Sequence, residues 1–104
     1  MILEHAILNV RPGESPAFLF AIREALPLMT ATPGFISFDL KPCLEASGRY
    51  LLLVRWETVE AHTVGFRGSE RYQKWRGLLH HFYDPFPVVE HYGEPLLTAE
   101  RPQT

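Results

Sequence analysis

The chain has 104 residues, the size of a single domain. Hydrophobic residues make up 46% of it and charged residues 21%, which is typical of a folded globular protein and excludes a disordered or collagen-like one. Its formal charge of −2 provides no basic field for phosphate backbones or anionic lipid, so we expect neither nucleic acid nor membrane as a partner. The single cysteine, Cys43, excludes an internal disulfide and any zinc site built on several cysteines.

The N-terminal residues predict the location of the protein. Met1 to His5 contain no basic stretch and no small-residue cleavage site, so we expect no secretory signal and a cytoplasmic protein. The longest apolar run, residues 51–54, is far shorter than the roughly 20 residues that a membrane helix needs. We therefore expect no membrane span.

The first strand and the first helix follow directly from the start of the chain. Residues 2–10 are mostly apolar and end at a Pro-Gly turn, which predicts a strand. Ser15 followed by Pro16 predicts a helix with serine as its N-cap and proline in its first turn. Apolar residues at spacings of three and four carry this helix to about Thr30, and Pro27 is expected to kink its last turn.

A hairpin is expected next. Residues 35–40 have the composition of a strand that ends near Pro42. Residues 45–48 make a short connection into residues 50–56, the strongest strand in the sequence. This third strand is expected at the centre of the fold.

The second crossover is expected to be a helix in two pieces. Thr58 can cap a short piece over residues 59–64, and Ser69 can cap a longer one over residues 70–83. The glycines that separate the pieces are Gly65 and Gly68. The second crossover is therefore predicted to be a broken helix.

A short fourth strand over residues 88–92 completes the order βαββαβ. This order is the ferredoxin-like split unit, so the predicted fold class is α+β. Residues 1–92 then form the domain, and residues 93–104 form an extended C-terminal tail.

The predicted sheet is apolar on both faces. Side chains alternate between faces along residues 51–54, and all four are apolar. Because two helical segments cover only one face of the sheet, we expect the other face to pair with a second copy of the chain. The alternative is a monomer whose tail, with Leu96 and Leu97, folds across that face.

Three segments and one nearby histidine match the sequence pattern of a known protein family. They are Ala6-Ile7-Leu8-Asn9-Val10-Arg11-Pro12-Gly13, Pro33-Gly34-Phe35-Ile36-Ser37-Phe38, Val54-Arg55-Trp56-Glu57-Thr58 and His62. Together they resemble the antibiotic biosynthesis monooxygenase domain family, from Met1 to about Tyr92. The resemblance implies a dimeric α/β barrel, formed by contact between two sheets, with a ligand pocket between the helices and the sheet of each subunit.

The resemblance also implies a class of reaction. Some members oxygenate polycyclic phenols to quinones without metal or flavin, some oxidise hydroquinones and some open haem. In the polyketide-oxygenating members a strand-end tryptophan, a helix arginine and a strand asparagine are implicated. Trp56 matches the tryptophan, Arg76 falls near the position of the arginine, and Leu52 replaces the asparagine. Leu8, Gly65 or Phe66, and Trp75 occupy the positions of the three haem-degrading signatures, which are therefore missing.

The residues themselves offer a proton acceptor and an aromatic wall. A histidine such as His62 has an ordinary pKa of about 6.5, suited to a general base, although a helix histidine can equally cap a carbonyl or lie in solvent. Arg76 and His80 border an aromatic arc of the long helix, where the arginine could hold a ligand oxygen or pair with a carboxylate. His80 and Asp84 supply only two metal donors, so no metal is expected.

We therefore expect a homodimer that oxidises a small phenol-like or quinol-like aromatic molecule with O₂ and needs no cofactor. His62 would be the base, Arg76 would stabilise the oxyanion, and Trp56 would wall the pocket. The expected substrate-binding residues are Trp75, Phe66, Tyr72 and His80. The alternatives are a non-enzymatic ligand-binding protein of the same fold and a haem-binding or haem-degrading member.

Overall fold

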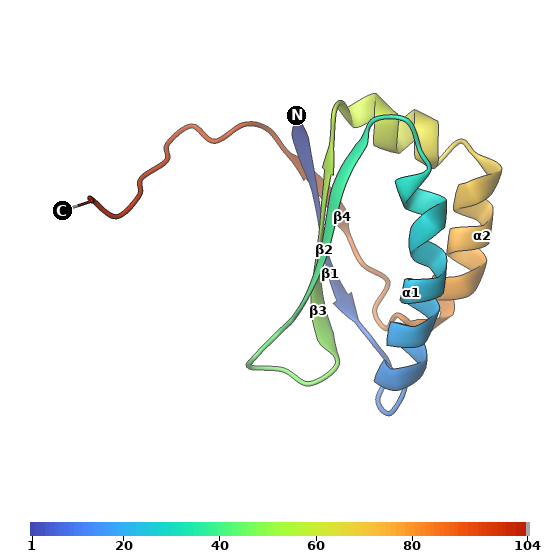
Figure 1. The fold of residues 1–104 in the computed structure, drawn as a ribbon. Helices are drawn as coiled ribbons and strands as arrows, with labels where there is room; N and C mark the ends of the chain where they lie inside the picture. The colour runs from blue at the N-terminus through green and yellow to red at the C-terminus, as the bar shows by residue number, and fades with distance from the viewer. Residues whose placement is uncertain (104) are drawn as a thin grey trace.

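The computed structural model describes residues 1–103 and shows a sheet covered by helices on one face (Figure 1). The four strands lie in the order β2-β3-β1-β4, and every neighbouring pair is antiparallel. The elements are β1 (Ile2–Asn9), α1 (Ser15–Thr30), β2 (Phe35–Pro42), β3 (Arg49–Trp56), η1 (Ala61–Phe66), α2 (Glu70–Leu79), η2 (His80–Phe82) and β4 (Val89–Tyr92). The predicted α+β ferredoxin-like fold is confirmed, with β1 and β3 at its centre.

Helix α1 lies along the sheet with one apolar face buried. It buries Phe18, Ile22 and Met29 at the helical spacing that the sequence predicts. The prediction that Ser15 caps this helix is wrong by one residue, because Glu14 is the N-cap and makes no side-chain capping bond. In residues 1–103, no helix combines the length and the apolar composition that crossing a membrane requires.

The second crossover is a broken helix, as predicted, but its first piece continues two residues further than expected, through Gly65 to Phe66. Thr58 caps the first piece by accepting a hydrogen bond from the backbone N–H of Ala61 at 3.1 Å. Gly65 lies inside η1, which is wound as a π-helix, and Arg67 N–H donates to His62 O at 3.0 Å. Ser69 then caps α2, as predicted, by accepting from Tyr72 N–H at 3.3 Å.

The C-terminal end of the second crossover is shorter than expected. Helix α2 ends at Leu79, and the three residues after it form the 3₁₀ turn η2. Tyr83 is extended and pairs with Val10 beyond the end of β1, so it does not belong to the helix. The turn brings the aromatic side chain of Tyr83 under α1, with its ring centroid 6.0 Å from that of Phe18.

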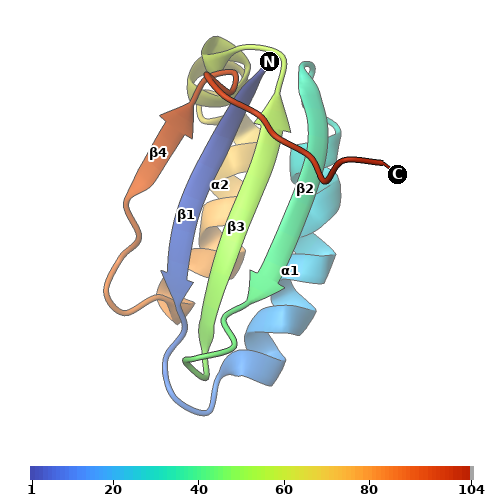
Figure 2. The same ribbon diagram turned by 90° about the vertical axis from the view of Figure 1, so that its left-hand side faces the viewer.

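The face of the sheet away from the helices is open in the single chain (Figures 1 and 2). The sheet is not closed into a barrel, and Ile7 on this face is 46% exposed. The tail leaves β4 and projects away from the sheet, with Leu96 98% and Leu97 94% exposed. The tail therefore does not cover the face as the monomer alternative requires; Thr104 lies outside the described residues.

Gly34, in the turn before β2, is required both by its backbone conformation and by its close packing against η1. Its φ is +89°, and a Cβ added there would lie 2.6 Å from the Cβ of Ala61 at the start of η1. Gly13 also has a positive φ, +79°, but nothing lies within 4 Å of the place a Cβ would occupy. The two glycines share the backbone constraint, and only Gly34 carries the packing constraint.

We expect Gly34→Ala to destabilise the protein more than Gly13→Ala does, by about 1–3 kcal/mol, because it adds an overpacked contact to the same backbone strain. Urea unfolding of the two variants beside the wild type measures the difference. Equal losses of stability would show that the turn and η1 can move apart freely.

Candidate active site

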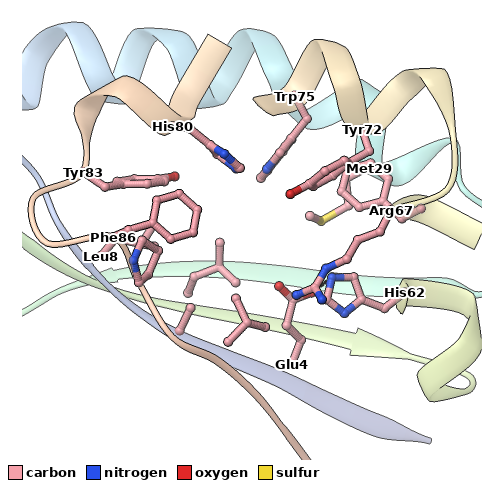
Figure 3. Close-up of a pocket in the computed structure, with 15 residues that line it drawn as sticks. Glu4, Leu8, Met29, His62, Arg67, Tyr72, Trp75, His80, Tyr83 and Phe86 are labelled. Atoms are coloured by element: carbon pink, nitrogen blue, oxygen red, sulfur yellow. Dashed lines mark ion pairs between the residues drawn. The ribbon is translucent and has the colours of Figure 1, made fainter. Parts of the chain in front are cut away.

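A cavity of about 390 Å³ lies between the helices and the inner face of the sheet (Figure 3). The lining side chains from the sheet are Glu4, Ala6, Leu8, Leu52 and Val89. Those from the helices and the segments that follow them are Met29, His62, Phe66, Arg67, Tyr72, Trp75, His80, Tyr83, Phe86 and Pro87. Most of the wall is apolar or aromatic, and the acidic and basic groups Glu4, His62 and Arg67 gather at one end in Figure 3.

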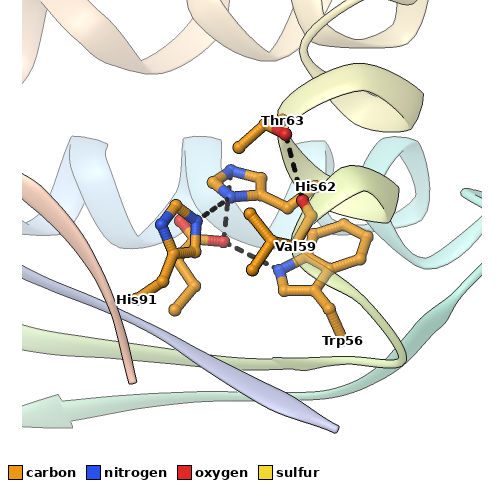
Figure 4. Close-up of polar contacts among 6 residues, drawn as sticks. Trp56, Val59, His62, Thr63 and His91 are labelled. Atoms are coloured by element: carbon orange, nitrogen blue, oxygen red, sulfur yellow. Dashed lines mark hydrogen bonds and ion pairs between the residues drawn. The ribbon is translucent and has the colours of Figure 1, made fainter. Parts of the chain in front are cut away.

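The polar end of the cavity is a connected chain of four side chains (Figure 4). The indole Nε1–H of Trp56 donates to Glu4 Oε1 at 2.9 Å. The same oxygen lies 3.3 Å from His62 Nε2. On the other side of that imidazole, His62 Nδ1 lies 2.8 Å from His91 Nε2, within hydrogen-bond distance.

Strand alternation explains why a carboxyl group is buried here. Glu4 alternates with Leu3 and His5 along β1, so its side chain points to the same inner face as Ala6. It pairs with His91 on β4, which places the histidine beside it on that face. Glu4 is 5% exposed, and Trp56 behind it is fully buried.

The π-helix η1 places His62 over this carboxyl group. The imidazole stacks on the indole of Trp56, with ring centroids 5.3 Å apart and an interplanar angle of 19°. The ring of Phe66 is a second aromatic neighbour, with its centroid 6.5 Å from that of His62 and 6.1 Å from that of Trp56. His62 is only 3% exposed, with both aromatic rings packed beside it.

Burial changes the acid–base behaviour of both groups. Loss of hydration raises the pKa of Glu4 to about 7, against the lowering effects of the Trp56 hydrogen bond and the Arg67 charge. Loss of hydration, with the positive charge of Arg67 and the neighbouring His91, lowers the pKa of His62 to about 3. Near neutral pH the imidazole is neutral, and the carboxyl group is the member of the pair that gains or loses a proton.

The structure brings together five of the seven residues predicted for the site. His62, Phe66, Tyr72, Trp75 and His80 all line the cavity. Trp56 does not line it; it lies behind His62 and donates its indole N–H to Glu4. Arg76 is exposed on α2 and does not line the cavity either.

The arginine that lines the cavity is Arg67 and not the predicted Arg76. It follows η1, is exposed, and extends its side chain to the end of the cavity where His62 and Glu4 lie (Figure 3). Sequence reasoning missed it because Arg67 lies in the connection between the two helical pieces, and the sequence pattern does not fix the direction of a connection. The positive charge at the polar end therefore comes from the end of η1 and not from α2.

Glu4 and His91 were also missed as site residues. Glu4 is an acidic residue in an otherwise apolar strand, and this pattern could have marked it, but the face of the strand it occupies depends on strand register. His91 becomes a neighbour of Glu4 only through the β1–β4 pairing. Among residues 1–103 no group of three or more His, Cys, Asp or Glu side chains is arranged to hold a metal ion.

Comparison with known proteins establishes the family. The family model described as antibiotic biosynthesis monooxygenase matches residues 1–78, so the chain belongs to this family. An uncharacterised protein of Bacillus subtilis strain 168, YczJ, is 49% identical over 94 residues, which cover 90% of this chain and 99% of that protein.

Solved structures carry the same fold. A Bordetella bronchiseptica protein described as an antibiotic biosynthesis monooxygenase on a provisional basis superposes with a TM-score of 0.86 at 37% identity, covering 91% of this chain and 97% of that one. The protein Rv0793 of Mycobacterium tuberculosis superposes with a TM-score of 0.76 at 22% identity, covering 95% and 98%. At its lower identity the second likeness concerns the fold alone.

The opposed pKa shifts of Glu4 and His62 predict opposed pH dependences of stability. The raised pKa of Glu4 stabilises the folded chain at low pH, and this contribution is lost between its ordinary value of 4.5 and about 7. The lowered pKa of His62 destabilises the folded chain at low pH, and this penalty disappears between about 3 and the ordinary value of 6.5. The two contributions oppose each other where their ranges overlap.

We expect the free energy of unfolding of Glu4→Gln, relative to the wild type, to rise as the pH rises from 4.5 to 7. That of His62→Gln should fall relative to the wild type from pH 3 to 6.5. Each difference should approach a slope of about 1.4 kcal/mol per pH unit. Urea unfolding across this pH range measures both, and differences with the same sign would contradict the assigned shifts.

Proposed function

We propose that the protein is a monooxygenase that oxidises a small hydroxylated aromatic molecule with O₂ inside this cavity. The observation that carries the proposal is the buried Glu4–His62 pair beside Arg67, at one end of an otherwise aromatic and apolar cavity. Membership of the antibiotic biosynthesis monooxygenase family supports the same class of reaction.

The two ends of the cavity suit the two parts of such a substrate. The aromatic body packs among Phe66, Tyr72 and Trp75, whose rings meet edge to face at centroid distances of 5.4 and 5.7 Å around Phe66. The hydroxyl group lies at the polar end, where the Glu4–His62 pair removes its proton. The guanidinium of Arg67 then stabilises the oxyanion that forms.

The chemistry balances without an external reductant. The phenolate transfers one electron to O₂, and the resulting radical and superoxide combine to form a carbon–oxygen bond at a ring carbon. The ring carbon then loses its proton while the O–O bond breaks, which leaves a carbonyl group and releases one oxygen atom as water. A phenol and O₂ thus give a quinone and water, and the enzyme moves protons while the substrate supplies the electrons.

Oxygen uptake by metal-stripped protein tests this function against a panel of anthrones, naphthols and hydroquinones. We expect uptake by the wild type, and a loss of about 10²–10³-fold in kcat for Arg67→Gln, because an oxyanion-stabilising donor is removed. Arg76→Gln is the matched control and should retain uptake, since Arg76 is exposed outside the cavity. Binding of panel compounds without uptake would instead indicate a non-enzymatic ligand-binding protein.

We further propose that the open face of the sheet pairs with a second copy of the chain to form a dimeric barrel. Ile7 pairs with Leu51, and His5 with Leu53, so apolar side chains from both central strands share this face. The helices cover the opposite face, and the tail projects away from this one (Figure 1). A second sheet packed against it would bury these side chains.

We expect Ile7→Arg to convert a dimer of about 24 kDa, twice the 12.0 kDa chain mass, into a monomer in light scattering coupled to gel filtration. Phe20→Arg provides the control, because Phe20 is 67% exposed on helix α1 and Ile7 is 46% exposed on the sheet. A wild type that is monomeric at micromolar concentration, or a Phe20 variant that alone dissociates, would contradict pairing through the sheet.

A further inference from the structure

The chain of polar contacts at the cavity does not end at His62. It continues through the 2.8 Å contact to His91 Nε2, on the edge strand β4. His91 is only half-buried, whereas His62 and Glu4 are 3% and 5% exposed. The contacts therefore lead from a buried carboxyl group to a half-buried histidine that does not line the cavity.

We propose that Glu4 is the proton acceptor of the cavity and that His62 and His91 connect its carboxyl group to solvent at the edge of the sheet. The assignment of Glu4 rests on the proposed function; the proton path rests on the contacts themselves. Glu4 is a catalytic residue in this proposal because it lines the cavity, and His91, which does not line it, is a positioning residue.

The chain has two states that differ by one proton. In the protonated state Glu4 carries the proton on Oε1, 3.3 Å from His62 Nε2. His62 Nδ1–H donates to His91 Nε2, and His91 carries its proton on Nδ1. When His91 Nδ1 releases its proton to water, the His62 Nδ1 proton moves to His91 Nε2 and the Glu4 proton moves to His62 Nε2. One proton leaves, both imidazoles end neutral, and Glu4 is left as a carboxylate.

The ionised state is the one that Trp56 stabilises. The carboxylate then accepts a hydrogen bond from Trp56 Nε1–H on Oε1, and His62 Nε2–H lies 3.3 Å from the same oxygen. Its other oxygen can accept the hydroxyl proton of a substrate. The path through His91 lets Glu4 reach this state while a substrate fills the cavity, because the exchange with water takes place at the sheet edge.

The charges around the chain favour neutral imidazoles. Burial is the larger cause of the lowered pKa of both His62 and His91, and the charge of Arg67 lowers both further. The same charge opposes the rise in the pKa of Glu4. The remaining titratable groups that face the cavity are Tyr72 on α2, His80 on η2 and Tyr83. Burial lowers the pKa of His80, with the Arg76 charge as a smaller cause, and burial raises the pKa of Tyr83 above its usual range. Neither His80 nor Tyr83 therefore supplies a competing negative charge near neutral pH.

The two states can be distinguished without any activity. In ¹⁵N-labelled protein, two-bond ¹H–¹⁵N spectra report which ring nitrogen of each histidine carries the proton. We expect the protonated nitrogen to change from Nδ1 to Nε2 on both His62 and His91 as the pH rises through about 7, the pKa of Glu4. The Trp56 indole N–H resonance should shift with the same midpoint, and Glu4→Gln should abolish all three changes.

Kinetics on a substrate from the oxygen-uptake panel test the catalytic part. We expect Glu4→Gln to lower kcat by about 10²–10⁴-fold, while Glu24→Gln, the same change on the exposed surface of α1, retains it. His91→Phe should fix His62 in one tautomer and remove the rise of kcat with pH through about 7, while His81→Phe, the same change at an exposed position, should leave that rise in place.

Two results would overturn the proposal. One is a His62 ring that keeps a single tautomer while the Trp56 resonance titrates, which would show that the proton does not pass through the histidines. The other is a Glu4→Gln variant that oxidises the substrate as fast as the wild type. If the tautomers switch as expected but no compound supports oxygen uptake, the proton path stands and the oxygenase function fails.

Discussion

The burial of one carboxyl group beside an indole organises the polar end of the cavity. Glu4 points inward from a central strand, so removing its hydration costs free energy that only local partners can offset. Trp56 donates to it, His62 lies against it, and η1 is wound as a π-helix at the position of that histidine. The polar end of the cavity is the consequence, since these partners gather where the carboxyl group is.

The same burial shifts the pKa values of two neighbouring side chains in opposite directions. Taken in isolation, His62 is the obvious base, because the ordinary pKa of histidine lies near neutrality. Burial lowers the pKa of His62 to about 3 and so removes that property, while the buried carboxyl group, ordinarily a weak base, acquires a pKa of about 7. Arg67 reinforces the division because its charge disfavours an imidazolium and favours a carboxylate.

Local sequence patterns predicted the helices and strands well where the structure depends on residues that are close together in the sequence. Thr58 and Ser69 cap the helices as expected, because a cap depends on residues three positions apart. Gly65 was misjudged as a break, since a π-helix accommodates it and the packing of His62 on Trp56 is a tertiary contact. The aromatic wall was predicted because Tyr72 and Trp75 repeat at helical spacing, whereas Arg76 fell on the exposed side of the same helix.

The sequence by itself determined the strand and helix order, the ferredoxin-like class, the family resemblance and most of the aromatic residues around the cavity. These depend on periodicity, caps and short motifs, all of which act within a few residues. Only the tertiary structure decided that Glu4, His62 and His91 form one chain and that Arg67 is the arginine beside it. The physical reason is that strand register and the direction of a helix after its break are set by contacts between distant segments, such as the pairing of Glu4 with His91.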